Sequence, residues 1–432
     1  MCGRTTCLAA LFTFTLLIAG CTSGVSVATS SSVPTNRSPA TFVASVTVSA
    51  SPAQKVTNTP QKVETITPTP STAAALTPTP TVRAFSLVQR CDGSHIRVDD
   101  ARILPGQIVY GFLSTPSRGL WSTNSSFAYG RQIATLGSTS KVVASPDGDR
   151  LLIGPPRTSG ALATVLSPDG KINFDFTWPG SWPTILSVNW IDEARLSYYT
   201  DDSVFLLTPN THPISQQLSL PSLPDLMHIR GGSFAVNSLL TRVAYATHDF
   251  GLAMRQLPNG EAVATYHFQI SQSTAPFRWS PDGTALAVMA QDPSDPSFRS
   301  DELFIFDESG QGGRVSNLSQ YFDRFGPLSM DWSRNGRFIA IWAKATPKGQ
   351  LAPNDEYRLF LFDLANQVVT DYCLTNSTAQ HKVTYIGATW SPDSAQLYVL
   401  MHDDTPGIIL DLSSGNVLEL PSDIYIAAWS KS

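Results

Sequence analysis

Seven Asp and His residues stand directly after short apolar runs, where their side chains could form a binding site. They are Asp201, Asp202, His248, Asp249, His402, Asp403 and Asp404. Carboxylates and imidazoles bind divalent cations, and grouped carboxylates also attract a basic peptide. The competing interpretation is that these residues simply begin solvated loops, because all seven lie in turn-prone contexts and no fixed spacing connects them.

The apolar runs before these residues belong to a repeat. Each copy has an apolar strand, a turn and a second apolar strand, and successive copies lie about 39 to 58 residues apart. The copies are "VVASPDGDRLLIG" (142–154), "VNWIDEARLSYYT" (188–200), "FAVNSLLTRVAYAT" (234–247), "FRWSPDGTALAVMA" (277–290), "MDWSRNGRFIAIWA" (330–343), "ATWSPDSAQLYVLM" (388–401) and the terminal "AAWSKS". Trp190, Trp279, Trp332, Trp390 and Trp429 occupy the same place in five of them.

Each copy is followed by a weaker hairpin, and four short strands per unit are typical of a β-propeller blade. The sequence therefore predicts an all-β propeller over residues 84–432. The segment 422–432 supplies a first strand, whereas 106–136 supplies three strands with none before them. Pairing these two ends completes one blade and closes a ring of seven. A six-bladed ring with 106–136 as an added cap is the alternative.

The turn Ser-Pro-Asp-Gly has a local explanation. Proline fixes φ at the first turn position, Ser and Asp bond nearby backbone N–H groups, and glycine accepts positive φ. We therefore predict a structural role, rather than a catalytic one, for Asp147, Asp282 and Asp393.

The motif "WSPDG" at 279–283, approximated at 332–336 and 390–394, resembles the TolB-like β-propeller repeat of bacterial envelope proteins. The resemblance covers most of 140–432 and implies a fold more than a function. The chain has a Ser/Thr/Pro-rich spacer where TolB has a small α/β domain, which makes a role in the Tol system doubtful.

Short catalytic motifs are missing from the sequence. No G-x-S-x-G, H-E-x-x-H or C-x-x-C occurs, and "SGQGG" (309–313) fits a hairpin turn. The absence of these motifs argues against an enzyme but does not exclude one, since propeller enzymes carry their catalytic groups on loops that no short motif describes. We expect no cofactor.

Two long loops on adjacent blades, 291–302 and 344–356, are the second candidate for recognition, because rigid scaffolds carry contacts on long loops. Phe298, Arg299 and Leu351 are the contact candidates. Disordered insertions are the alternative.

The N-terminus has the pattern of an export signal over residues 1–20. "LIAGC" ending at Cys21 resembles the lipobox of bacterial lipoproteins, which implies that Cys21 carries lipid. Residues 21–83 are rich in Ser, Thr and Pro and cannot build a core. They predict a disordered linker that could reach roughly 190 Å from a membrane.

The charge of the chain argues against nucleic acid as a partner. The net charge is −5 at pH 7, and every acidic residue except Glu64 follows residue 83, so the predicted domain lacks the basic surface that binds phosphates.

The cysteine content predicts one disulfide. Only Cys91 and Cys373 remain in the folded domain, and in an exported protein such a pair predicts a disulfide. Two unpaired thiols are the alternative.

Together these observations predict a monomeric, lipid-anchored protein of the bacterial cell envelope, exposed outside the cytoplasmic membrane. Its propeller would be a scaffold that binds a protein or glycan partner. The alternative is a propeller hydrolase or lyase that acts on saccharides or lactones through the Asp and His residues named first.

Overall fold

The structure is a computed structural model that divides into two units, 1–75 and 76–432. The residues it describes are 85–97, 104–112, 119–124, 127, 130–136, 141–154, 162–177, 187–199, 204–209, 214–218, 223, 226, 234–270, 277–291, 300–349, 356–376, 388–399, 407–421 and 424–431. The predicted signal peptide, Cys21 and the linker lie outside these residues.

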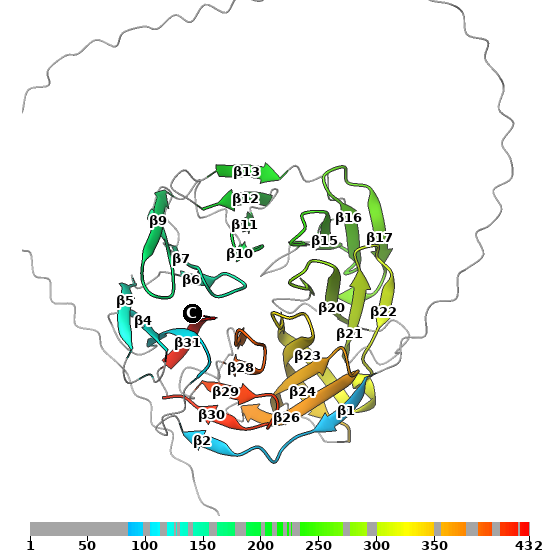
Figure 1. Ribbon diagram of the computed structural model, residues 1–432. Coiled ribbons are helices and arrows are strands. Elements are labelled where there is room, and N and C mark those ends of the chain that lie inside the picture. Colours follow the sequence, from blue (N-terminus) through cyan, green and yellow to red (C-terminus); the bar gives the residue numbers. More distant parts are fainter. Residues whose placement is uncertain are drawn as a thin grey trace, which may run out of the picture. The chain divides into compact units, whose positions relative to one another are not determined.

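The described strands of the second unit form seven sheets that lie around a common centre (Figure 1). The innermost strands of neighbouring sheets contact one another, for example β19 with β23 and β31 with β6 (bounds below). These sheets form a β-propeller. The described part includes the short 3₁₀ helix η3 (Leu318–Gln320), and within this part no helix is long and apolar enough to cross a bilayer.

Four of the sheets have four strands, and each runs outward from its innermost strand. The first contains β31 (Ile424–Ser430), β3 (Gln107–Phe112), β4 (Gly119–Thr123) and β5 (Arg131–Thr135). The second contains β6 (Lys141–Ala144), β7 (Leu151–Gly154), β8 (Leu162–Leu166) and β9 (Ile172–Thr177). The third contains β10 (Ser187–Trp190), β11 (Leu196–Tyr199), β12 (Val204–Thr208) and β13 (Ile214–Leu218). The fourth contains β14 (Phe234–Val236), β15 (Arg242–Ala246), β16 (Leu252–Gln256) and β17 (Ala262–Tyr266).

Three sheets have a fifth strand. One contains β19 (Phe277–Trp279), β20 (Ala285–Gln291), β21 (Asp301–Asp307) and β22 (Gly312–Arg314), with β18 (Gln269–Ile270) also paired to β20. The next contains β23 (Phe322–Trp332), β24 (Phe338–Pro347), β25 (Glu356–Asp363), β26 (Val368–Asn376) and β1 (Ser86–Gln89). The last contains β27 (Ala388–Trp390), β28 (Gln396–Val399), β29 (Ile408–Asp411), β30 (Val417–Glu419) and β2 (His95–Arg97).

One sheet combines the two ends of the domain. The C-terminal strand β31 pairs antiparallel with β3, and Val109 lies opposite Ala428. Both residues are buried, and Ile108 and Trp429 in the next pair are buried as well. The sheet therefore depends on a pairing between residues more than 300 positions apart.

A feature that the sequence does not predict is the N-terminal strap, residues 85–97. Strand β1 pairs parallel with β26, and β2 pairs parallel with β30, so the strap adds an outer strand to two neighbouring sheets. In Figure 1 it runs along the outer margin of both. A hairpin pattern cannot reveal this arrangement, because each strand of the strap joins a sheet formed from residues far along the chain.

The hairpin turns confirm the structural role predicted for the Ser-Pro-Asp-Gly motif. The Ser280 hydroxyl donates to Asp282 and accepts the N–H of Ala285 at 2.9 Å. Ser391 repeats both contacts, with Asp393 and with the N–H of Gln396. The Ser-Asp pair therefore satisfies the backbone of a tight turn.

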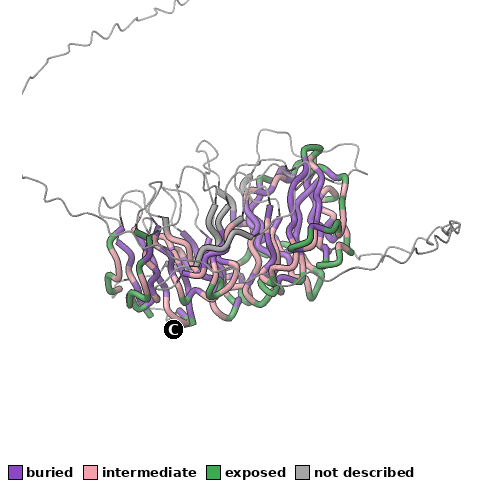
Figure 2. The backbone as a smooth tube through the Cα atoms, turned by 90° about the horizontal axis from the view of Figure 1, so that it is seen from above, coloured by how far each residue is buried: buried purple, intermediate pink, exposed green. Residues whose placement is uncertain are grey.

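The repeated tryptophans link neighbouring sheets. The indole N–H of Trp190 donates to the Val143 carbonyl of the preceding sheet at 2.9 Å, and Trp279 donates to Ala235 at 3.1 Å. The Trp190 ring also packs in a core cluster with Leu152 and Val165 of the preceding sheet. Figure 2 shows that buried residues run along the strands of the domain. Exposed residues lie at turns between the strands.

One predicted loop is partly wrong. The sequence predicts a loop from residue 344 onward, but β24 continues through Pro347, which pairs with Phe322 of the long strand β23. The ladder continues because Phe325 and Ala345 are both buried and supply apolar contacts beyond the usual length of an inner strand.

Candidate functional site

Most of the predicted binding residues lie outside the described part of the chain, and their binding role stays a prediction. These residues are Asp201, Asp202, Phe298, Arg299, Leu351, His402, Asp403 and Asp404. The two that are described, His248 and Asp249, lie exposed in the turn between β15 and β16.

Asp249 behaves as a turn residue in this structure. Its carboxylate accepts the Thr247 hydroxyl and the N–H of Gly251, and the Thr247 bond holds its pKa below the ordinary value. His267 Nδ1 lies 3.2 Å from Asp249 Oδ2, although both side chains are largely exposed. Within the described residues, no three His, Cys, Asp or Glu side chains lie close enough to hold a metal ion.

A cavity of about 480 Å³ lies between β1, the start of β23, the end of β24 and the start of β25, and we call it the edge cleft. Its lining residues are Leu87, Gln89, Tyr321, Phe322, Pro347 and Arg358. They come from the strap, from the residues around the start of β23, from the end of β24 and from β25. The cleft offers apolar and aromatic walls with an amide and a guanidinium, a combination that is typical of a binding pocket.

The wall formed by β1 is fixed at its start by a buried aromatic ring. Phe85 packs edge-on against Phe362, with 6.0 Å between the ring centroids, and its N–H donates to the Val315 carbonyl at 3.0 Å. Strand β1 then begins with the N–H of Ser86, which donates to Gln367 at 3.1 Å. Burial of Phe85 therefore sets where β1 lies against β26.

A buried ion pair lies below the cleft. Arg358 Nη1 donates to Asp371 Oδ2 at 2.7 Å, and the Asp371 side chain is fully buried. Asp371 also accepts the N–H of Cys373 at 2.8 Å. A buried carboxylate needs such partners, because an unpaired charge away from water is strongly unfavourable. The pair therefore fixes the guanidinium that lines the cleft.

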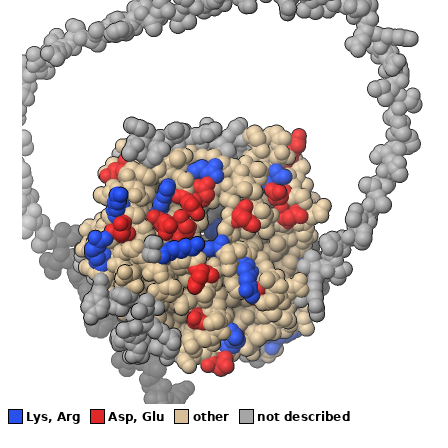
Figure 3. All heavy atoms as spheres, viewed as in Figure 1, with Lys and Arg blue, Asp and Glu red and all other residues tan. Residues whose placement is uncertain are grey.

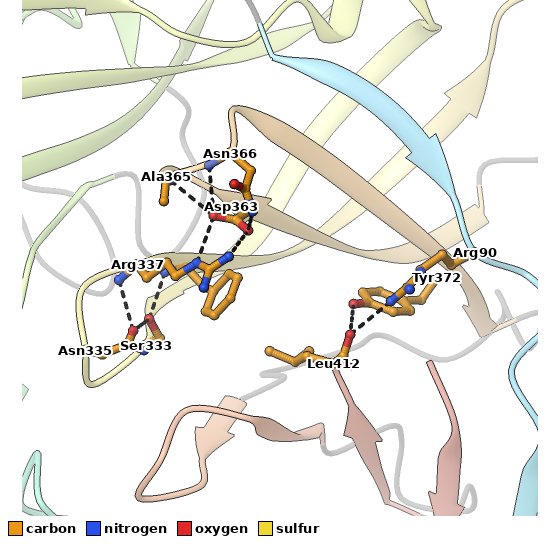
Figure 4. Close-up of polar contacts among 10 residues, drawn as sticks. Arg90, Ser333, Asn335, Arg337, Asp363, Ala365, Asn366, Tyr372 and Leu412 are labelled. Atoms are coloured by element: carbon orange, nitrogen blue, oxygen red, sulfur yellow. Dashed lines mark hydrogen bonds and ion pairs between the residues drawn. The ribbon is translucent and has the colours of Figure 1, made fainter. Parts of the chain in front are cut away.

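A disulfide fixes the far end of β1. Cys91 bonds Cys373, with 5.2 Å between their Cα atoms, and the N–H of Arg90 donates to the Asp371 carbonyl at 2.8 Å. Figure 4 shows Arg90 and Tyr372 converging on the Leu412 carbonyl of the neighbouring sheet, at 3.0 and 3.3 Å. The strap is thus fastened to both sheets whose outer edges it covers.

Figure 4 also shows, for comparison, an ion pair in the same sheet between an exposed arginine and a partly buried aspartate. Arg337 and Asp363 lie 2.7 Å apart at the turn ends of β24 and β25. Asp363 also accepts the N–H groups of Ala365 and Asn366, so this pair belongs to a turn rather than to the cleft.

The face that carries the hairpin turns shows no large patch of one charge among the described residues. In Figure 3, acidic and basic side chains lie interspersed around a hollow near the middle of the face. Arg334 reaches across the centre and donates to the carbonyls of Asp147 and Trp429, which belong to two other sheets. Burial lowers its pKa, against the opposing effect of Asp147 and Asp149. We assign this arginine to the packing of the ring.

No family model and no curated protein matches this sequence. Among solved structures, the chain is similar to the β-propeller domain of Myceliophteria thermophila Cps50 (Swd1), with 14% identity over 75% of this chain and 97% of that one and a TM-score of 0.41. It is also similar to Kluyvelomyces marxianus Hsv2, with 12% identity over 76% and 100% of the two chains and a TM-score of 0.42. The WD40 domain of Neurospora crassa Pan2 shares 13% identity over 66% and 79%, with a TM-score of 0.40.

Similarity at this level does not indicate which ligands or partners this chain binds. The fold assignment rests on the seven sheets themselves, and the TolB-like relationship stays a prediction.

Proposed function

We propose that this protein is a lipid-anchored protein of the bacterial cell envelope whose propeller binds a protein or glycan partner. The observation that carries the binding role is the edge cleft, whose apolar, aromatic and polar lining is fixed in place by the strap. The anchor follows from the residues before Cys21, and the spacer after it would hold the domain away from the membrane.

The proposed mechanism is rigid presentation of a formed site. Because β1 is held by Phe85 and by the disulfide, little ordering of the protein accompanies binding, and a preformed site loses less entropy. The proposed role needs no bond to break.

The binding role is tested by capture. The chain from residue 21, with Cys21→Ser to keep it in solution, is immobilised and incubated with solubilised envelope proteins and with a glycan array. We expect a specific partner whose retention falls at least roughly tenfold for Tyr321→Ala, which removes an aromatic wall of the cleft. Leu162→Ala, an exposed apolar residue of β8, is the matched control and should bind like the wild type. No retained partner, or equal loss in both variants, would contradict the role.

The anchor is tested separately. We expect the full chain to incorporate labelled palmitate and to enter the detergent phase, and Cys21→Ser to do neither. Label that persists in Cys21→Ser would show that this cysteine is not the lipid site.

A further inference from the structure

We propose that the partner binds as an extended peptide that adds to the free edge of β1 as a new strand and places one side chain in the edge cleft. This inference rests on the proposed binding function and assigns the chemistry of the partner. It follows from the direction of the backbone groups of β1 and from the cavity beside them.

One edge of β1 is used by β26. In the parallel ladder, Ser86 lies opposite Val368, the N–H of Ser86 donates to Gln367, and that of Arg90 donates to Asp371. Successive residues of a strand direct their backbone groups to opposite edges. The N–H and C=O groups of Leu87 and Gln89 therefore point away from β26, where none of the described strands pairs with β1. The N–H of Phe85 points to the same edge and donates to the Val315 carbonyl, so the free part of this edge begins at Leu87.

The same two residues line the cleft. The side chains of Leu87 and Gln89 form its wall, whereas Val88, directed to the other face of the strand, is 42% exposed. A peptide that bonds to the free edge of β1 therefore lies next to the cleft. Addition to a sheet edge takes its affinity from main-chain hydrogen bonds and its specificity from pockets for alternate side chains, and β1 supplies both.

Other outer strands also have a free edge within the described residues. Strand β5 begins with Arg131 and β22 ends with Arg314, and charged edges discourage pairing. Strand β1 shares an uncharged sequence without proline with β13 and β17, but of these three strands only β1 lines the edge cleft. It is also held rigidly at both ends, so it is already in the conformation that an added strand requires.

The shape of the cleft defines the preferred peptide. Its volume of about 480 Å³ accommodates a large side chain, and Tyr321, Phe322 and Pro347 give that side chain an apolar surround. We therefore expect an extended segment of at least four residues, matching β1 in length, with an aromatic or large aliphatic residue at the position beside the cleft.

The test compares two substitutions at one position. Gln89→Pro and Gln89→Ala both remove the amide side chain, but only proline removes the outward N–H, and an edge strand tolerates proline where its N–H faces solvent. A phage-displayed library of random eight-residue peptides is selected on the Cys21→Ser chain. Selected peptides are then titrated by fluorescence anisotropy against wild type and both variants.

We expect Gln89→Pro to weaken peptide binding by roughly tenfold or more, and Gln89→Ala by less than about threefold. Hydrogen exchange supplies a second readout that needs no variant: the amides of Leu87 and Gln89 should gain protection when a selected peptide binds, and those of β13 should not.

Equal binding to both variants, or new protection away from β1, would overturn the inference. If an envelope partner is still captured in that case, the proposed function stands and only the mode of recognition is wrong. A library that yields no peptide also overturns the inference, and failure to capture any partner removes the proposed function itself.

Discussion

The four internal tryptophans of the repeat differ in what their indole N–H meets. Trp190 donates to the Val143 carbonyl, whereas Trp390 occupies the same place in a later copy and its buried N–H has no partner. Both rings are buried. Comparing the two tryptophans therefore distinguishes the contribution of the indole hydrogen bond to stability from that of ring packing.

Trp190→Phe should therefore destabilise the domain more than Trp390→Phe does. Both changes remove similar ring volume, but only the first leaves the Val143 carbonyl without its donor, and the difference should be about 1–2 kcal/mol in the free energy of unfolding. Urea unfolding of the two variants measures it. Equal losses would show that the indole bond contributes nothing.

The contribution of the turn residue Asp282 to the stability of the domain depends on pH. Burial acts to raise the pKa of Asp282, but the hydrogen bonds from Ser280 and from the N–H of Thr284 outweigh it and lower the pKa below 3.8. Asp282 is therefore ionised at lower pH in the folded chain than in the unfolded one. Its contribution to stability is present above the unfolded pKa and is lost as the pH falls through the folded value.

Asp282→Asn should thus destabilise the domain at pH 7 and destabilise it less at pH 3. The loss at pH 7 should not exceed about 1 kcal/mol, because solvent screens an exposed side chain. Urea titrations at both pH values provide the comparison. A loss of the same size at pH 3 would mean that the charge is not responsible.

At the scale of elements, local patterns predicted the hairpins and missed the strap. Each Ser-Pro-Asp-Gly turn and its flanking apolar residues lie within about a dozen consecutive positions, so a local pattern predicts them. The two strands that flank Asp282 lie where the repeat predicts them. Strand β1 has four residues, and its partner β26 begins 282 positions later. Only Cys91 and Cys373 hinted at this contact, because a disulfide must bring its two segments together.

The strap makes the disulfide important for stability. The loop it closes spans 282 positions, for which the chain-entropy estimate is about 5.6 kcal/mol. We expect a Cys91→Ala/Cys373→Ala variant to unfold at a clearly lower urea concentration, followed by tryptophan fluorescence. Wild-type protein in a reductant should shift to the same midpoint, and the variant should ignore the reductant. A wild-type midpoint unaffected by reduction would contradict this expectation.

At the scale of the whole molecule, the pairing between the two ends lies where the sequence predicts it, with Val109 opposite Ala428. The edge cleft was not predictable in the same way. Leu87 and Tyr321 both line the cleft although they lie more than 230 positions apart in the sequence. A periodic sequence pattern cannot predict such a contact. The predicted rim lies mostly outside the described residues, and Asp249 is explained by its own turn.

Deleting residues 424–432 should abolish cooperative unfolding, because β31 is the innermost strand of its sheet and Trp429 is fully buried. Deleting only 431–432, which follow the strand, should leave the transition unchanged. Calorimetry of both truncated chains distinguishes them. A sharp transition in the longer deletion would show that the ring does not need its last strand.

The strap also determines how the domain responds to tension. A pull that arrives through the chain ahead of Phe85 acts on the end of β1 and can peel away only a few residues before it reaches Cys91. The covalent bond there transfers the load to β26, far along the chain from the strap. In oxidising surroundings, β1 therefore cannot be pulled away from β26 beyond Cys91 while the disulfide is intact.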